Sequence, residues 1–236
     1  MTQHFLTRWM MNAGVLAAVL VLSFALRAEE VAPKAPAEAP AKTAWKVLCD
    51  GTTLKDWKVT PFGGEGAVKA EGGAIVLPRG SELTGINWAG AALPVRNYEV
   101  ALEAKKVDGL DFFCGLVFTV GDSQCSFVVG GWGGGVVGLS SIDGLYADDN
   151  QTTTHGSFDD GRWYKIRLRV SEKYIQAWID DKRVVRLDTT GKKVSVHPAI
   201  EQMKPLGVAC YSTTSEVKNI RIRDLAKDET VEVPKE

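Results

Sequence analysis

Residues 162–170 read Arg-Trp-Tyr-Lys-Ile-Arg-Leu-Arg-Val. Apolar side chains alternate strictly with basic ones, so that Tyr164, Ile166, Leu168 and Val170 share one face of an extended chain. A period of two with one polar face is typical of a β-strand that covers a core on one side only. The stretch therefore predicts a half-buried strand.

Strands are also predicted before and after residues 162–170. Residues 98–105 alternate in the same way, and two hairpins are indicated, at 175–187 around Asp180-Asp181 and at 112–129 around Gly121-Asp122. Further strands are expected at 45–49, 74–77, 136–140, 207–211 and 217–223. We find no amphipathic helical pattern from residue 45 onward. The expected fold is all-β, a sandwich of two antiparallel sheets.

Composition narrows the class of protein. The chain has 236 residues, of which 45% are hydrophobic, and this fraction is enough for a packed core. The formal net charge is −1. A balanced charge argues against a general nucleic-acid binder, because such proteins need a basic face.

The N-terminus resembles a targeting segment. Arg8 precedes an uncharged apolar run at 10–26, and small residues follow at cleavage-like positions. Residues 1–28 are therefore expected to be a signal peptide or, if uncleaved, an N-terminal membrane anchor. We expect an exported protein, either periplasmic, in the cell envelope or secreted, with no other membrane contact.

The remaining chain divides into three parts. Residues 29–44 are rich in Ala and Pro and predict an extended linker. Residues 45–225 carry the strand patterns and form the expected domain, and residues 226–236 form a charged tail that we expect to fray.

The sequence allows two states for the cysteines, buried free thiols or disulfide bonds. The set is Cys49, Cys114, Cys125 and Cys210. A turn at 121–122 would place Phe118 opposite Cys125, so Cys114 would lie more than about 10 Å along the strand from that partner. This excludes a Cys114–Cys125 bridge. No spacing suggests zinc.

Two loops carry candidate site residues. The run at 130–135 is Gly-Gly-Trp-Gly-Gly-Gly, in which Trp132 is either a platform for a sugar ring or a turn residue packed on the sandwich edge. The loop at 143–150 is acidic and suits either a solvated turn or Ca²⁺ bound by Asp143, Asp148 and Asp149. No other cofactor is expected. His155 is a candidate general base, and His197 is expected to be an ordinary loop residue.

Several motifs resemble those of the 3-keto-disaccharide hydrolase domain family. Residues 48–57, Leu-Cys-Asp-Gly-Thr-Thr-Leu-Lys-Asp-Trp, resemble its opening Leu-Phe-Asn/Asp-Gly-x-x-Leu-x-x-Trp. Residues 97–99, 111–118, 178–181 and 217–222 resemble later motifs in the same order. The likeness spans about 45–225 and implies a concanavalin A-like jelly roll that acts on oxidised sugars outside the cytoplasm.

Two functional hypotheses follow. The first is an enzyme that cleaves 3-keto-glycosides with Asp111, Asp148 and His155 as catalytic groups. The second is a non-catalytic module, tethered in the cell envelope, that binds a glycan or another partner. In the module, Trp88, Trp132 and Tyr146 would stack on sugar rings, while Asp148 and Asn150 would bond their hydroxyl groups. Residues 125–131 lack the carboxylates that the family carries there, which favours the second hypothesis. The chain also lacks the Glu-x-Asp-x-x-Glu strand of laminarinase-type glycosidases.

Overall fold

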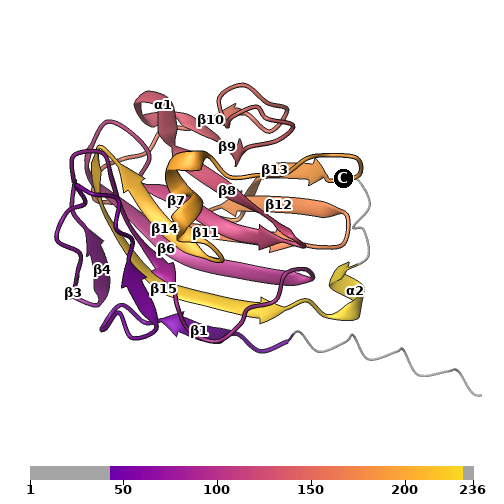
Figure 1. Ribbon diagram of the computed structural model, residues 1–236, viewed down its shortest axis with the longest axis horizontal. Helices are drawn as coiled ribbons and strands as arrows, with labels where there is room; N and C mark the ends of the chain where they lie inside the picture. The colour runs from indigo at the N-terminus through magenta and orange to yellow at the C-terminus, as the bar shows by residue number, and fades with distance from the viewer. Residues whose placement is uncertain (1–42, 231–236) are drawn as a thin grey trace, which may run out of the picture. The chain divides into compact units, whose positions relative to one another are not determined.

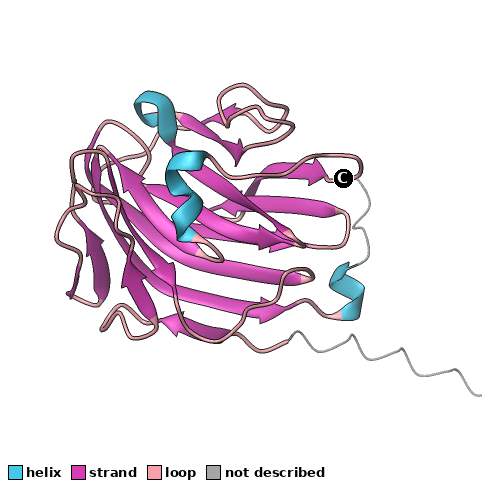
Figure 2. Ribbon diagram, viewed as in Figure 1, coloured by secondary structure: helices cyan, strands magenta, loops and turns pink. Residues whose placement is uncertain are grey.

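Two antiparallel sheets pack face to face in the computed structural model, which describes residues 43–230 (Figures 1 and 2). The first sheet has eight strands. In spatial order they are β13 (Lys182–Asp188), β12 (Tyr174–Ile179), β11 (Trp163–Val170), β6 (Tyr98–Gly109), β15 (Thr213–Asp224), β4 (Ala74–Leu77) and β3 (Lys69–Glu71), with β1 (Lys46–Cys49) also paired to β15.

The second sheet has seven strands. In spatial order they are β10 (Thr154–His155), β9 (Val136–Ser140), β8 (Ser123–Gly130), β7 (Cys114–Val120), β14 (Gly207–Tyr211), β5 (Leu83–Trp88) and β2 (Trp57–Val59). The described helical segments are short and are α1 (Gly131–Gly134), η1 (Pro198–Met203) and α2 (Lys227–Thr230). The expected all-β sandwich of antiparallel sheets is confirmed.

Alternating side chains from both sheets build the core. On β11, Ile166, Leu168 and Val170 are buried in the same cluster as Phe118 and Phe127 of the second sheet. The register of the β7–β8 hairpin agrees with the turn expected at 121–122, because Phe118 lies opposite Cys125. The sequence patterns did not predict β2, β3, β5 or β10.

The four cysteines are buried and free in the described part of the chain. Burial raises the pKa of the Cys114 and Cys125 thiols to about 12. Their side chains therefore act as small apolar core residues rather than as nucleophiles.

An ionic cluster occupies one end of the first sheet's outer face. Glu99 on β6 accepts hydrogen bonds from Arg169 on β11 (2.7 and 2.9 Å) and from Arg223 on β15 (3.0 Å). Glu229 of α2 pairs with Arg223 at 2.6 Å, and the Arg223 guanidinium lowers the pKa of Glu229 to about 2. These bonds hold α2 on the sheet, so the fraying expected from residue 226 does not begin there.

The N-terminal predictions, a signal peptide or anchor at 1–28 and a linker at 29–44, fall almost entirely outside the described residues. Within residues 43–230, no helix is long and apolar enough to cross a membrane.

Candidate functional site

The outer face of the second sheet carries small side chains at its centre. Because side chains alternate, Cys114 and Leu116 of β7 point into the core, whereas Val117 points outward. Gly115 lies on the same outward face and leaves it without a side chain. Ser126 of β8 and Ala209 of β14 also contribute to this outer face. The sheet therefore offers a shallow floor between bulkier flanking segments.

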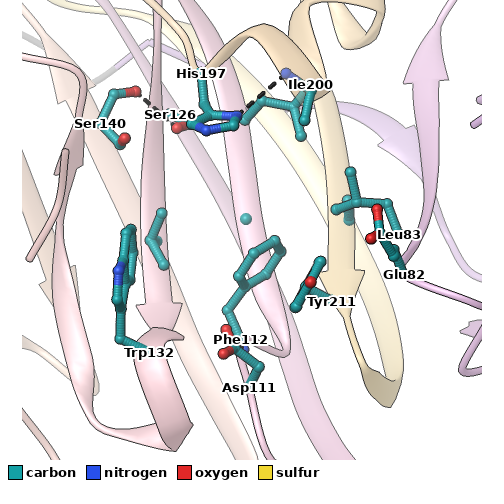
Figure 3. A pocket seen from close by; sticks show the side chains of 14 residues that line it. Glu82, Leu83, Asp111, Phe112, Ser126, Trp132, Ser140, His197, Ile200 and Tyr211 are labelled. Atoms are coloured by element: carbon teal, nitrogen blue, oxygen red, sulfur yellow. Dashed lines mark hydrogen bonds between the residues drawn. The ribbon is translucent and has the colours of Figure 1, made fainter. Parts of the chain in front are cut away.

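A pocket of about 360 Å³ lies on this floor (Figure 3). Its lining joins strands of the second sheet to three segments that are distant in sequence, namely the loop before β7, α1 and the start of η1. The lining residues are Glu82, Leu83, Asp111, Phe112, Gly115, Ser126, Val128, Trp132, Ser140, His197, Ala199, Ile200, Ala209 and Tyr211.

Asp111 fixes the turn that carries Trp132. Its Oδ1 accepts a hydrogen bond from the Phe112 amide (2.7 Å), and its Oδ2 accepts one from the Gly133 amide (3.2 Å). Gly133 has a positive φ of 84°, which glycine adopts readily. Trp132 is held at a positive φ of 48°, which bulky side chains rarely adopt. The Trp132 side chain is 45% exposed and borders the pocket. This is the prominent position that a stacking platform needs.

Phe112 and Tyr211 form the aromatic base of the pocket. Their rings stack with centroids 5.9 Å apart and an interplanar angle of 28°. A Cβ at Gly115 would lie 2.9 Å from the Phe112 ring, so the glycine lets this ring lie close to the sheet. Figure 3 shows His197 facing Phe112, with Trp132 and Tyr211 on the two sides of Phe112.

His197 lines the pocket from the residue before η1. Its Nδ1 accepts a hydrogen bond from the Ala199 amide (3.2 Å) and so caps η1. In the neutral ring this bond assigns the proton to Nε2, which makes Nε2–H a hydrogen-bond donor. The ring also contacts that of Tyr146, with centroids 4.7 Å apart. His197 is thus a pocket residue, and the expectation of an ordinary loop histidine is corrected.

Of the residues predicted from sequence, the structure brings Asp111 and Trp132 together in the pocket. Tyr146 is exposed and lies outside the pocket lining, although its ring contacts that of His197. Asp148 and His155 are exposed and lie outside the pocket lining. His155 belongs to β10 at the sheet edge, where it pairs with Val136.

The side chains of Trp88 and Asn150 make their contacts inside the fold. The predicted sugar contacts of both residues are therefore corrected. Trp88 is 5% exposed, packs edge-on against Trp57 and donates from Nε1 to the Ala91 carbonyl (2.7 Å). The Asn150 amide donates to the carbonyls of Leu139 (2.7 Å) and Tyr146 (2.6 Å). Trp88 is therefore a core residue. The hydrogen bonds of Asn150 stabilise the loop to which it belongs.

The acidic loop shows no preformed cation cage. Asp143 pairs with Lys192 at 2.8 Å, and its other oxygen accepts from the Lys193 amide (2.9 Å). Among the described residues, no group of three or more His, Cys, Asp or Glu side chains could hold a metal ion. Calcium at Asp143, Asp148 and Asp149 remains a prediction from the sequence.

Sequence reasoning missed several pocket residues, namely Glu82, Phe112, Ser126, Ser140, His197 and Tyr211. For His197 a signal existed, because His-Pro-Ala is a plausible start for a helical turn with the histidine as its cap. The others lie on strands or strand ends, where only the assembled sheet shows which face they occupy.

Solved structures with related folds are distant in sequence. A Crh5 transglycosylase in complex with NAG is 12% identical with a TM-score of 0.53, and the match covers 78% of this chain and 87% of that chain. A Bacillus subtilis protein of unknown function with a galectin-like fold is 11% identical with a TM-score of 0.52, covering 79% and 97%. At such identities the likeness shows the fold alone.

The family assignment comes from sequence models. No curated protein matches this chain. The model of the 3-keto-alpha-glucoside-1,2-lyase-like domain matches residues 44–223. This match confirms the resemblance drawn from the motifs, and it covers the strands and loops that form the pocket. The chain belongs to the 3-keto-alpha-glucoside-1,2-lyase-like domain family, a carbohydrate-active family with a jelly-roll fold.

Proposed function

We propose that this chain, exported by its apolar N-terminal run, binds a glycoside in the pocket and cleaves 3-keto-glycosides by elimination. The observation that carries the proposal is the composition of the pocket. Two carboxylates, Glu82 and Asp111, line it together with His197 and the exposed ring of Trp132. Family membership supplies the class of substrate.

The reaction needs few protein groups. A ketone at C3 acidifies the hydrogen at C2, so a base can remove it as a proton and leave an enolate. The enolate electrons then form the C1–C2 double bond while the C1–O bond to the leaving group breaks. The departing oxygen takes up a proton and leaves as an alcohol. A base and a donor to the developing enolate oxygen contribute most to the rate.

The pocket residues fit these roles. The Nε2–H of His197 is the donor for the C3 oxygen, because its Nδ1 is held by the Ala199 amide. Glu82 is the exposed carboxylate of the lining and takes the C2 proton. Asp111 already accepts two amide hydrogen bonds, so it serves mainly to position the Trp132 turn.

A second candidate function is a non-catalytic glycan-binding module. The observation that favours it is the floor of the pocket on β8, where Ser126 and Val128 stand in place of any carboxylate. The same aromatic side chains would then bind a sugar without cleaving it. Binding without turnover is the property that separates the two candidates.

The test is to incubate the protein with a 3-keto-glycoside and, in parallel, with the unoxidised parent glycoside. We expect release of the leaving group from the keto form only, because the parent lacks the acidified C2 hydrogen. Product release would be followed by chromatography and mass spectrometry. Binding of both compounds without release from either would overturn the enzymatic proposal and support the module.

A further inference from the structure

The outer face of the eight-stranded sheet carries charged side chains in rows that run across its strands. Two of these rows share one pattern, in which a carboxylate on β6 lies between a cation of β15 and a cation of β11. The two rows are Lys218–Glu103–Lys165 and Arg223–Glu99–Arg169. Glu99 accepts hydrogen bonds from both of its arginine neighbours, and Glu103 pairs with Lys218 at 3.7 Å. A carboxylate in the middle of a row therefore balances the cations beside it.

The row between these two has no carboxylate. Its β6 position is Ala101, which lies between Arg221 of β15 and Arg167 of β11. Neighbouring strands are ~4.8 Å apart, so the backbones of the two arginines are separated by ~10 Å with only a methyl group between them. Within residues 43–230, Arg221 and Lys165 form no ion pair, and Arg167 reaches Glu99 only at 3.4 Å. This row therefore lacks the negative charge that the other two rows have.

A cavity of about 450 Å³ lies over this row. Three cationic side chains line it, those of Lys165, Arg167 and Arg221. The Arg167 guanidinium lies 3.7 Å from the centre of the Trp178 ring, and the Arg221 guanidinium lies 4.8 Å from that of Trp45. A guanidinium that stacks through its face keeps the N–H groups at its edge for hydrogen bonds. The cavity thus combines ordered cationic donors with an open space above Ala101.

We infer that this cavity binds the carboxylate of an acidic sugar, such as a uronic-acid unit of a polysaccharide. The carboxylate lies between Arg167 and Arg221, in the place that Glu99 and Glu103 take in the other two rows. Glu103 and Asp181 also line the cavity and can accept hydrogen bonds from sugar hydroxyl groups. The same two carboxylates disfavour a densely anionic partner such as a phospholipid surface, because like charges would then face each other. This site lies on the other sheet from the proposed catalytic pocket and does not depend on the proposed function.

The test is a calorimetric titration with oligogalacturonate and with its methyl ester, which has the same sugar ring without the charge. We expect the acid to bind at least ~10-fold more tightly, because the ester loses the charge-assisted hydrogen bonds to Arg167 and Arg221. The affinity for the acid should also fall as the salt concentration rises. Equal affinities for acid and ester would overturn the inference. Tighter binding of poly-glutamate than of oligogalacturonate would also overturn it and would identify an acidic peptide as the occupant.

Two substitutions locate the binding on this face. Ala101→Glu supplies the missing carboxylate from within the chain, and Arg221→Gln removes one of the two cations. Each should lower the affinity for the acid at least ~10-fold. Thermal melts of the same preparations check that each variant is folded.

Arg186→Gln is the matched control. Arg186 stacks on the Tyr174 ring of the same sheet at 4.3 Å, but it lies outside the cavity lining. This variant should bind the acid as the unmodified protein does. Unchanged binding in both Ala101→Glu and Arg221→Gln would overturn the inference. An equal loss in Arg186→Gln would overturn it as well, because the attraction would then come from the charge of the whole face.

Discussion

Replacing His197 by asparagine should lower kcat for a 3-keto-glycoside by about 10²–10³-fold, the usual contribution of one hydrogen-bond donor to a developing oxyanion. The asparagine Oδ1 can accept the Ala199 amide as Nδ1 of His197 does, so the cap of η1 is kept. What is lost is the Nε2–H that the proposed mechanism assigns to the C3 oxygen. Initial rates and thermal melts of the same preparations measure the two effects separately.

A second substitution separates capping from chemistry. His197→Ala should lose the same activity and, in addition, about 1 kcal/mol of stability, because the Ala199 amide loses its acceptor. Loss of activity in His155→Asn, with His197→Asn fully active, would contradict this assignment and restore the candidate predicted from sequence.

Replacing Glu99 by glutamine should lower the free energy of unfolding by about 3–5 kcal/mol, as expected when one partner of a buried ion pair is removed. Glu99 is 2% exposed and accepts hydrogen bonds from Arg169 and Arg223. The neutral amide would leave these guanidinium groups in the sheet face with Glu229 as their remaining carboxylate. Urea titrations monitored by tryptophan fluorescence would measure the loss.

The control for this experiment is Glu201→Gln. Glu201 forms an exposed pair with Lys204 at 2.7 Å, and such pairs contribute at most about 1 kcal/mol. An effect of Glu99→Gln no larger than that of Glu201→Gln would show that the cluster does not hold the sheet and α2 together as described.

Most of the fold follows from local sequence because each long strand carries its own period of two. β6 and β11 alternate over their shared length, and their cross-strand pairing follows. β5 was not predicted because its sequence, Leu-Thr-Gly-Ile-Asn-Trp, contains a glycine and an asparagine, which are both uncommon in strands. Its glycine is required by the neighbouring strand, because a Cβ at Gly85 would lie 2.7 Å from that of Ala209.

The site was less predictable because its residues come from segments far apart in the chain. Trp132 could be identified from the sequence because glycines surround it. Asp111 could be identified because it belongs to a family motif. Asn150 and Trp88 have the chemistry of sugar contacts, but their hydrogen bonds are used inside the fold. His197 and Glu82 reach the same pocket only because η1 and the start of β5 flank the outer face of the second sheet.

We propose that the pocket on the outer face of the second sheet is the carbohydrate site. The most direct measurement is a crystal structure of the protein soaked with an unoxidised glucoside. We expect the sugar ring in the pocket, in contact with Trp132 and within hydrogen-bond distance of Nε2 of His197. Sugar density on the outer face of the eight-stranded sheet, with the pocket lacking it at saturating concentration, would contradict the claim.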